Sequence, residues 1–209
     1  MTGTAGKQHR AKRSREEKYD ERRAQLAESA LATLGELGYA RTSLREIAQN
    51  SEFSHGVVHY YFSGKADLIL HCVRYYKADC ATRYDEIIAT ATSAEELAER
   101  FVERLVATMC EDASMHRLWY DLRGQSMFEQ ELAEQVAEID LLLEDMIWRV
   151  VTRFAELSGR QPAFSPSVSY AMVDGVFFRA LLAHLHGDDA VPERLRDDAC
   201  AVLPLLFRA

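Results

Sequence analysis

Cysteine and proline are both scarce in this chain of 209 residues, and each shortage excludes a class of protein. The four cysteines are too few and too scattered for a small secreted domain held together by disulfides, and none has the Cys-x-x-Cys spacing of a zinc or redox motif. They are expected to be buried, reduced thiols. With four prolines and no strict alternation of polar and apolar residues, little interrupts helices or favours a sheet. The sequence therefore predicts an all-α protein.

Long apolar runs are also missing. No stretch approaches the roughly 20 residues that a membrane-spanning helix needs, and the basic N-terminus lacks the apolar core of a signal peptide. We therefore expect a cytoplasmic protein with no membrane partner. Because 48% of the residues are apolar, the chain can bury one large or two small cores, which excludes a wholly disordered protein.

The net charge of −8 at first argues against a nucleic-acid partner, because lysine and arginine must neutralise phosphates. The charge is unevenly distributed, however. Residues 1–65 carry 11 Lys/Arg and 8 Asp/Glu, a balance of +3, whereas the other 144 residues carry 14 and 25, a balance of −11. Only the first third is therefore suited to face DNA. Within it, residues 1–16 are expected to form a flexible basic arm, which either contacts DNA or is a solubilising tail.

Capping signals delimit the first helices. A first helix is expected over 17–37, where apolar residues recur on one face, with Gly38 as its stop. Ser43 and Glu46 have the spacing of a capping box, which begins a second, short helix. A third helix follows after a break of only a few residues, capped by Ser54 and ending near Tyr61.

The third helix has an apolar inner face and an unusual outer one. Its outward side chains are expected to be His55, Val57, His59 and Tyr60, an aromatic and weakly charged surface for a helix that only needs to be soluble. Two short helices joined by a tight turn, after a longer supporting helix, are the elements of a helix-turn-helix, whose second helix enters the major groove of DNA.

The remainder of the chain predicts a larger helical domain. Cap and breaker residues predict helices over 63–90, 93–109, 114–125, 128–157 and 165–186, and a last one from 192 that Pro204 disturbs. An uninterrupted helix over 63–90 would form a lever leaving the smaller domain.

Two segments of the first third resemble a known family. They are 39–48, which reads YARTSLREIA, and 54–68, which reads SHGVVHYYFSGKADL. Together they resemble the N-terminal domain of the TetR family of bacterial repressors, over about 24–70, with Gly56, Tyr61, Phe62 and Lys65 at the spacing of that motif. The segment GVVHYYF, with Val173-Asp174-Gly175 and Arg179, is most similar to the BetI-like subgroup, which contains a choline-responsive repressor.

The resemblance implies an architecture and a function. A three-helix DNA-binding domain is expected over 17–66, and a ligand-binding and dimerisation domain over 67–209. The protein would be a homodimeric repressor on a palindromic operator in double-stranded DNA, released by a small-molecule effector that the sequence does not identify. Glu52 stands where the family usually has a turn glycine, which would carry strain if its φ were positive. Val57 and His59 also depart from the usual residues, so the operator sequence cannot be carried over.

Side-chain chemistry assigns roles within the DNA-binding segment. Arg45 can pair bidentately with guanine or clamp a phosphate, Val57 can touch a thymine methyl, and Lys65 can hold a phosphate. For each, a solvated surface side chain is the alternative. His55 and His59 lie four residues apart, but no third ligand is evident, so no metal site is expected. The predicted DNA-contacting residues are Thr42, Arg45, Ser54, His55, Val57, His59, Tyr60, Tyr61 and Lys65.

Two further sites are expected in the larger domain. Bulky side chains with a few polar groups predict an effector pocket formed by Phe101, Arg104, Met115, His116, Trp119, Tyr120, Met127, Phe128 and Phe178. The family's dimer interface, made by the last two helices, implies Tyr170, Val173, Phe177, Leu181, Leu195, Val202 and Leu206. For both sets the alternative is ordinary core. An anionic effector could be bound by Arg104, Arg123 and Arg179, although pairing with acidic residues is the simpler interpretation.

No enzyme activity and no cofactor are expected. The sequence contains no Gly-x-Ser-x-Gly elbow, phosphate-binding glycine loop or His-Glu-x-x-His pair, and no Glu-x-x-His repeats of a di-iron bundle. A helical adaptor that has lost DNA binding is the remaining alternative, and the departures at Glu52, Val57 and His59 keep it open.

Overall fold

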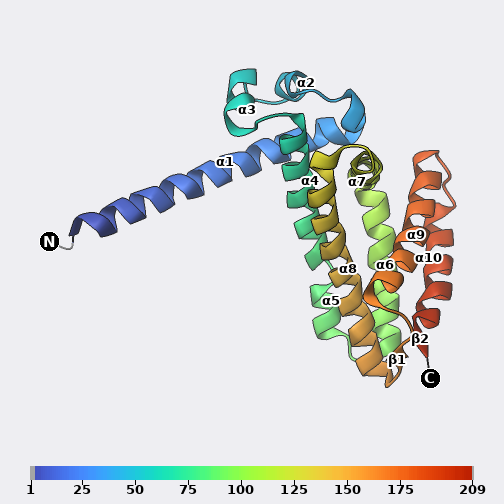
Figure 1. The fold of residues 1–209 in the computed structure, drawn as a ribbon. Coiled ribbons are helices and arrows are strands. Elements are labelled where there is room, and N and C mark those ends of the chain that lie inside the picture. The colour runs from blue at the N-terminus through green and yellow to red at the C-terminus, as the bar shows by residue number, and fades with distance from the viewer. Residues whose placement is uncertain (1–2, 209) are drawn as a thin grey trace. The chain divides into compact units, whose positions relative to one another are not determined.

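The computed structural model of the chain is helical almost throughout, as predicted (Figure 1). It describes the backbone of residues 3–208, and side chains from Glu17 onward apart from those of Ala32 and Ala40. Contacts divide the chain into two units, Met1–Tyr75 and Tyr76–Ala209. The sequence placed this division after residue 66; helix α4 (Lys65–Thr82) contributes to both units.

The first unit contains α1 (Gly3–Arg41), α2 (Leu44–Gln49), α3 (His55–Tyr61) and the beginning of α4. Helix α1 starts at Gly3, earlier than the expected residue 17. The side chains of the proposed basic arm, 1–16, lie outside the described residues, so its contact with DNA stays a prediction.

Both expected caps in the first unit are confirmed. The backbone N–H of Glu46 donates to Ser43 Oγ at 3.2 Å, and the Ser43 N–H donates back to Glu46 Oε2 at 2.7 Å. Ser54 Oγ accepts from the Val57 N–H at 3.3 Å and starts α3. The apolar faces of these helices share one core, which contains Leu26, Ala30, Leu34, Ile47, Phe53, Val58, Phe62, Leu68 and Ile69.

Gly38 changes the direction of the chain near the end of α1. Its φ of 74° and ψ of 175° lie in a region that is essentially restricted to glycine. The Thr42 hydroxyl donates to the Gly38 carbonyl at 2.7 Å and holds this bend closed. The predicted interruption of the first helix at Gly38 is therefore confirmed.

The substitution Gly38→Ala should destabilise the first unit by about 1–3 kcal/mol, because alanine pays the strain of this backbone conformation. Urea unfolding followed by circular dichroism measures the loss. Gly64→Ala is the matched control, since Gly64 lacks a positive φ and a Cβ added there would meet no atom within 4 Å. Equal stability of the two variants would contradict the prediction.

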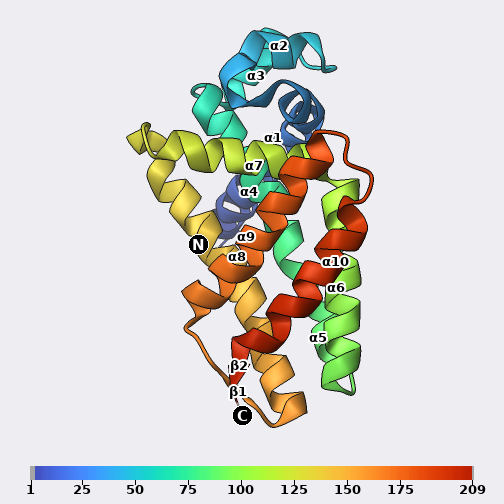
Figure 2. The same ribbon diagram turned by 90° about the vertical axis from the view of Figure 1, so that its right-hand side faces the viewer.

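The second unit is a bundle formed by the rest of α4 with six further α-helices. These are α5 (Asp85–Thr90), α6 (Ala94–Glu111), α7 (Ala113–Ser126), α8 (Gln130–Ser158), α9 (Pro166–Leu185) and α10 (Val191–Val202). Figure 2 shows α8, α9 and α10 side by side, in agreement with their contacts. The sequence did not predict the short antiparallel pair of β1 (Gln161–Pro162) with β2 (Phe207–Arg208), which follows the 3₁₀ turn Leu203–Leu206.

The expected helix over 63–90 is interrupted. The chain turns at Arg83 and Tyr84 between α4 and α5. Tyr84 is buried, with its ring centroid 4.9 Å from that of Phe101 on α6. The Arg83 guanidinium pairs with Asp112 at 2.6 Å. Both side chains are held by these contacts with α6 and with the residue that precedes α7. The chain turns where they are held, and α4 ends at Thr82.

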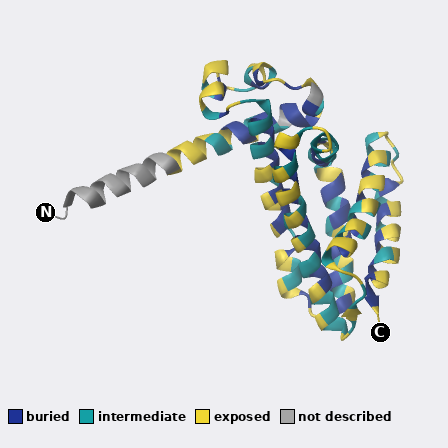
Figure 3. Ribbon diagram, in the orientation of Figure 1, coloured by how far each residue is buried: buried dark blue, intermediate teal, exposed yellow. Residues whose placement is uncertain are grey.

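One expectation from composition needs correction. Cys72 and Cys80 are buried, but Cys110 and Cys200 are exposed. Helix α9 is long and apolar enough to cross a membrane by length and composition, but it contains Asp174 and Arg179 and is not an uninterrupted apolar run. Only 22% of its most apolar 18-residue window is buried. Exposed residues recur along α9 in Figure 3, so much of its apolar surface is uncovered in one copy of the chain.

Candidate DNA-binding and ligand-binding sites

The outer face of α3 is exposed as the sequence predicted. Tyr60 is 71% exposed, and His55 and His59 are also exposed. Val57 is half-buried, whereas Val58, on the opposite side of the helix, is fully buried. This short helix therefore presents polar and aromatic side chains outward and is held by its apolar side.

Arg45 lies on the exposed side of α2, close to the beginning of α3. A shallow surface depression is lined by Arg45, Ala48, Gln49, Phe53, Ser54 and His55. The structure therefore brings the predicted guanidinium of α2 and the first outward residues of α3 to one surface. This is the arrangement that a helix-turn-helix needs to contact bases and phosphates together.

Tyr19 of α1 supports the end of α3, a contact that the sequence did not reveal. Its ring centroid lies 4.9 Å from that of Tyr61 and 6.4 Å from that of Tyr60. The Tyr19 hydroxyl also donates to the Tyr61 carbonyl at 3.4 Å. Nothing in the local pattern signals this pairing, because it joins residues about forty positions apart.

Thr42 does not fit its predicted role. It is 3% exposed, and its hydroxyl is used by the Gly38 carbonyl, so it cannot reach a duplex. Lys65 is half-buried with Nζ 4.2 Å from the ring centroid of Tyr39. Ser63, just before α4, donates from its N–H and hydroxyl to Asp67.

The turn before α3 is unstrained. Among the described residues only Gly38, Gly159 and Gly187 have a positive φ, so Glu52 carries none of the strain considered for it. The Nε2 atoms of His55 and His59 lie 3.2 Å apart, within hydrogen-bonding distance. In the described part of the chain no group of three His, Cys, Asp or Glu residues is placed to hold a metal ion.

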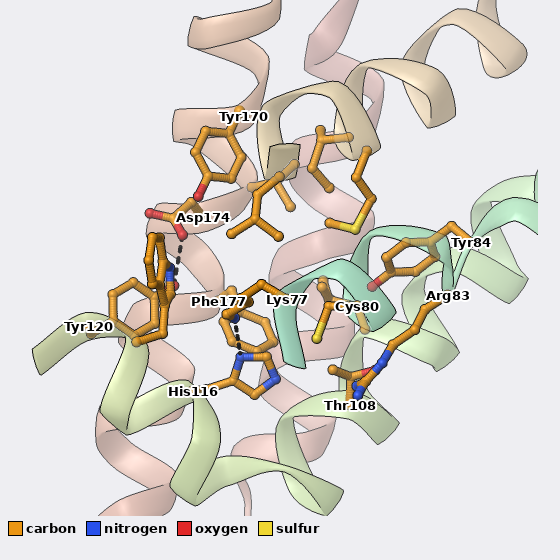
Figure 4. A pocket seen from close by; sticks show the side chains of 16 residues that line it. Lys77, Cys80, Arg83, Tyr84, Thr108, His116, Tyr120, Tyr170, Asp174 and Phe177 are labelled. Atoms are coloured by element: carbon orange, nitrogen blue, oxygen red, sulfur yellow. Dashed lines mark hydrogen bonds between the residues drawn. The ribbon is translucent and has the colours of Figure 1, made fainter. Parts of the chain in front are cut away.

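A cavity of about 540 Å³, including its open side, lies within the second unit (Figure 4). Of the nine residues predicted for the effector pocket it contains three, His116, Trp119 and Tyr120. The other lining residues are Lys77, Cys80, Arg83, Tyr84, Leu105, Thr108, Leu143, Met146, Ile147, Tyr170, Val173, Asp174 and Phe177.

The remaining six pocket predictions lie elsewhere. Phe101 is core beneath Tyr84, and Met127 and Phe128 are 75% and 86% exposed. Arg104 lies 3.8 Å from Glu111, the acidic pairing considered for it. Neither Met115 nor Phe178 lines the cavity, although the Phe178 ring packs on Tyr120 at 4.4 Å. Periodicity identified apolar helix faces here but not which of them meet.

The predicted dimer residues are mainly core of their own unit, the alternative considered for them. Val173, Phe177, Leu181, Leu195 and Leu206 are buried. Tyr170 lines the cavity and donates to Asp140 at 3.0 Å, and Val202 lines a smaller cavity beside Phe101. The exposed residues of α9 are a different set. Five of them are apolar or small and form what we call the α9 stripe, Val168, Ala171, Gly175, Phe178 and Leu182; Ser167 and Arg179 are exposed beside them.

One side of the cavity is a closed polar network. Asp174 accepts from the Tyr120 hydroxyl and from Arg123, each at 2.8 Å. Arg123 also pairs with Asp140 at 3.3 Å. Burial raises the pKa of Asp140, and burial together with Asp174 raises that of Tyr120. Arg123 is therefore paired with two carboxylates within the protein, as the simpler interpretation of Arg123 predicted.

The centre of the cavity holds Lys77 beside His116 (Figure 4). Lys77 Nζ lies 3.3 Å from His116 Nδ1, and the Tyr76 hydroxyl lies 3.4 Å from Nε2. Burial lowers the pKa of Lys77 to about 8. Burial, and then the charge of Lys77, lower that of His116 to about 2. The imidazole is therefore neutral; because an ammonium only donates, Nδ1 accepts from Lys77 and Nε2 carries the proton.

Comparisons with known proteins agree with the helix-turn-helix geometry. The family model described as "Bacterial regulatory proteins, tetR family" matches residues 26–72, which include α2 and α3. The HTH-type transcriptional regulator BetI of Burkholderia thailandensis is 28% identical over 182 residues, covering 85% of this chain and 90% of that protein. Residues 26–72 therefore form a DNA-binding domain of the TetR family. The chain is a DNA-binding transcriptional regulator, similar to BetI.

Solved structures confirm the fold of this TetR-family regulator. A TetR transcription regulator from Haloarcula marismortui aligns with a TM-score of 0.74 at 17% identity, over 90% of this chain and all of that one. The regulator FadR from Bacillus subtilis, solved with stearoyl-CoA, aligns with a TM-score of 0.69 at 18% identity, over 87% of this chain and 96% of that one. At these identities the likeness establishes the all-α, two-part fold alone.

Proposed function

We propose that this TetR-family regulator is a cytoplasmic, homodimeric repressor that binds a palindromic operator and is released by a small molecule. The observation that carries the DNA-binding role is the exposed polar and aromatic face of α3 with Arg45 beside it. Val58 and Phe62 anchor the inner side of this segment in the core, so the outer residues are presented on a fixed surface. Neither a cofactor nor a catalytic step forms part of the proposal.

The α9 stripe supports the homodimer. Its members are spaced by three and four residues, which places them on one side of the helix. Val168, Phe178 and Leu182 are large and exposed, while Ala171 and Gly175 between them are small enough to allow a close approach. An apolar face of this kind favours a self-complementary contact about a two-fold axis. A two-fold pair would bring two α3 helices to one palindromic operator.

Helix α4 supports ligand control. It begins at Lys65, directly after the DNA-binding segment, and reaches the cavity with Lys77 and Cys80. A ligand that prefers one position of this helix shifts the population toward it and, if that position disfavours DNA, weakens operator binding. Thermodynamic linkage then requires operator DNA to weaken ligand binding by the same factor.

Two substitutions on the proposed DNA-binding surface test the proposal. Arg45→Ala should weaken binding to duplex DNA from upstream of the regulator's own gene by about tenfold or more, since a bidentate base contact contributes about 1–3 kcal/mol. Tyr60→Phe should weaken it less, because only a hydroxyl contact is lost. Binding is measured by fluorescence anisotropy at fixed salt, because salt alone changes such affinities.

The control for these variants is Arg196→Ala, which removes an exposed arginine of the second unit that pairs with Glu103. It should leave operator affinity unchanged, and all variants should retain their thermal stability. Undiminished affinity of the Arg45 and Tyr60 variants would contradict the assigned surface. Failure of the unaltered protein to bind any upstream DNA would favour the helical adaptor.

A further inference from the structure

Lys77 is a buried cation without an acidic partner. It is 2% exposed, and among the described residues its ammonium has one hydrogen-bond acceptor, the neutral His116 ring. The rings of Tyr76 and Trp119 flank it, with centroids 5.4 Å and 5.5 Å from Nζ. Lys77 forms no ion pair with any carboxylate of the described residues within 4 Å. A buried charge left unpaired in this way is costly, so its retention needs a reason.

The other charged groups of the cavity already have partners. Arg83 pairs with Asp112 at 2.6 Å and lies 3.6 Å from Asp79. Asp174 is neutralised by Arg123 at 2.8 Å. The one charge of the cavity that lacks a counter-ion among the described residues is therefore the positive charge of Lys77.

Apart from Arg83 Nη1, which forms the ion pair with Asp112, two buried polar atoms of the same cavity lack hydrogen-bond partners among the described residues. They are the indole Nε1 of Trp119 and the hydroxyl Oγ1 of Thr108, and both residues are at least nine-tenths buried. An indole N–H can only donate, and a hydroxyl can donate, so both suit a ligand that carries acceptor oxygens. The rest of the lining is apolar and suits a hydrocarbon body: Leu105, Leu143, Met146, Ile147, Val173 and Phe177.

We propose that the effector is an organic carboxylate with an apolar body, whose acidic group replaces the missing counter-ion of Lys77 and accepts from Trp119. The aromatic lining alone would also suit a quaternary ammonium. Such a cation would have to lie beside an uncompensated ammonium, while the single carboxylate of the lining, Asp174, is held by Arg123. The inference rests on the proposed ligand-controlled function and specifies the ligand class.

Two matched series of compounds test the charge preference in the full-length protein. The first is octanoate, 1-octanol and octyltrimethylammonium; the second is 3-phenylpropanoate, 3-phenyl-1-propanol and its trimethylammonium analogue. Isothermal titration at pH 7 should show the carboxylate binding about tenfold or more tighter than the alcohol of the same body, as expected for a charged hydrogen bond. The ammonium compounds should bind most weakly.

Lys77→Met removes the charge and retains an unbranched side chain, and should abolish the preference for carboxylate over alcohol. Arg117→Met is the matched control, because Arg117 is exposed on α7 and does not line the cavity. It should leave the preference unchanged. If Lys77→Met does not fold, the two series of compounds on the unaltered protein still test whether the cavity prefers a carboxylate.

The inference is overturned if in both series the alcohol or the ammonium compound binds as tightly as the carboxylate, or if no carboxylate binds. It is also overturned if Lys77→Met keeps the preference. A carboxylate that binds through Lys77 without releasing operator DNA would sustain the ligand class and contradict the proposed release mechanism. The two failures are therefore distinguishable.

Discussion

Replacing Gly175 with arginine should convert the proposed dimer of this regulator to a monomer and lower its operator affinity by about a hundredfold or more, the usual scale of lost bivalency. Gly175 is at the centre of the α9 stripe, between Ala171 and Phe178. A long charged side chain there would separate two copies that approach through small residues. A Cβ added at Gly175 meets no atom within 4 Å, so the fold of one copy should tolerate the change.

Light scattering after size-exclusion chromatography measures the oligomeric state, and fluorescence anisotropy measures the affinity. Gly124→Arg is the matched control, because Gly124 is also a helical glycine, on α7, with no atom within 4 Å of an added Cβ. It should remain dimeric and bind operator normally. A Gly175→Arg protein that stays dimeric with full affinity would show that the copies associate through another face.

Acidification from pH 6.5 to pH 5 should cost the regulator about 1.6 kcal/mol of unfolding free energy through His116 alone. The pKa of His116 is lowered to about 2 by burial and then by Lys77 and Arg83. The folded protein therefore keeps this imidazole neutral while the unfolded chain takes up a proton near pH 6.5. The stabilisation is fully present above pH 6.5 and is lost as the pH falls toward 2.

Urea unfolding at pH 6.5 and pH 5 measures this loss. His116→Gln, which retains a donor and an acceptor but does not titrate, should show a loss smaller by that amount. The groups facing the ring are Lys77 and Tyr76 from α4, Arg83 from the turn that follows α4, the Thr108 backbone from α6, and the Phe177 ring at 4.7 Å from α9. His186→Gln, an exposed control, should behave like the unaltered protein. An equal loss in His116→Gln would refute the role of this histidine.

Local signals allowed the DNA-binding unit to be predicted from sequence. Capping by Ser43 and Ser54 depends on residues three positions away, so sequence alone locates the starts of α2 and α3. In a helix as short as α3, the apolar Val58 and Phe62 fix the inner side and leave few choices for the outer one. Thr42 was wrongly assigned to the DNA-contacting residues. Its hydroxyl donates to the Gly38 carbonyl, a contact that the sequence pattern does not show.

The lining of the cavity and the exposed side of α9 could not be predicted in this way. Where α4 ends is decided by contacts of Arg83 and Tyr84 with residues far along the chain. Helix α9 is apolar on both sides, so periodicity could not say which side meets the cavity and which is exposed. The burial of Lys77 could have been predicted from its spacing. It follows Val73 by four residues and precedes Cys80 by three, which places all three on one buried face of α4.

A hydroxyl-radical footprint on DNA from upstream of the regulator's own gene tests most directly whether two α3 helices bind one duplex. We expect two protected stretches on the same side of the duplex, about one helical turn or a multiple of it apart. At a protein concentration equal to the Kd of the unaltered regulator, both should weaken together in Arg45→Ala. A single unpaired protected stretch, or protection at that concentration that is undiminished by the loss of Arg45, would contradict the account.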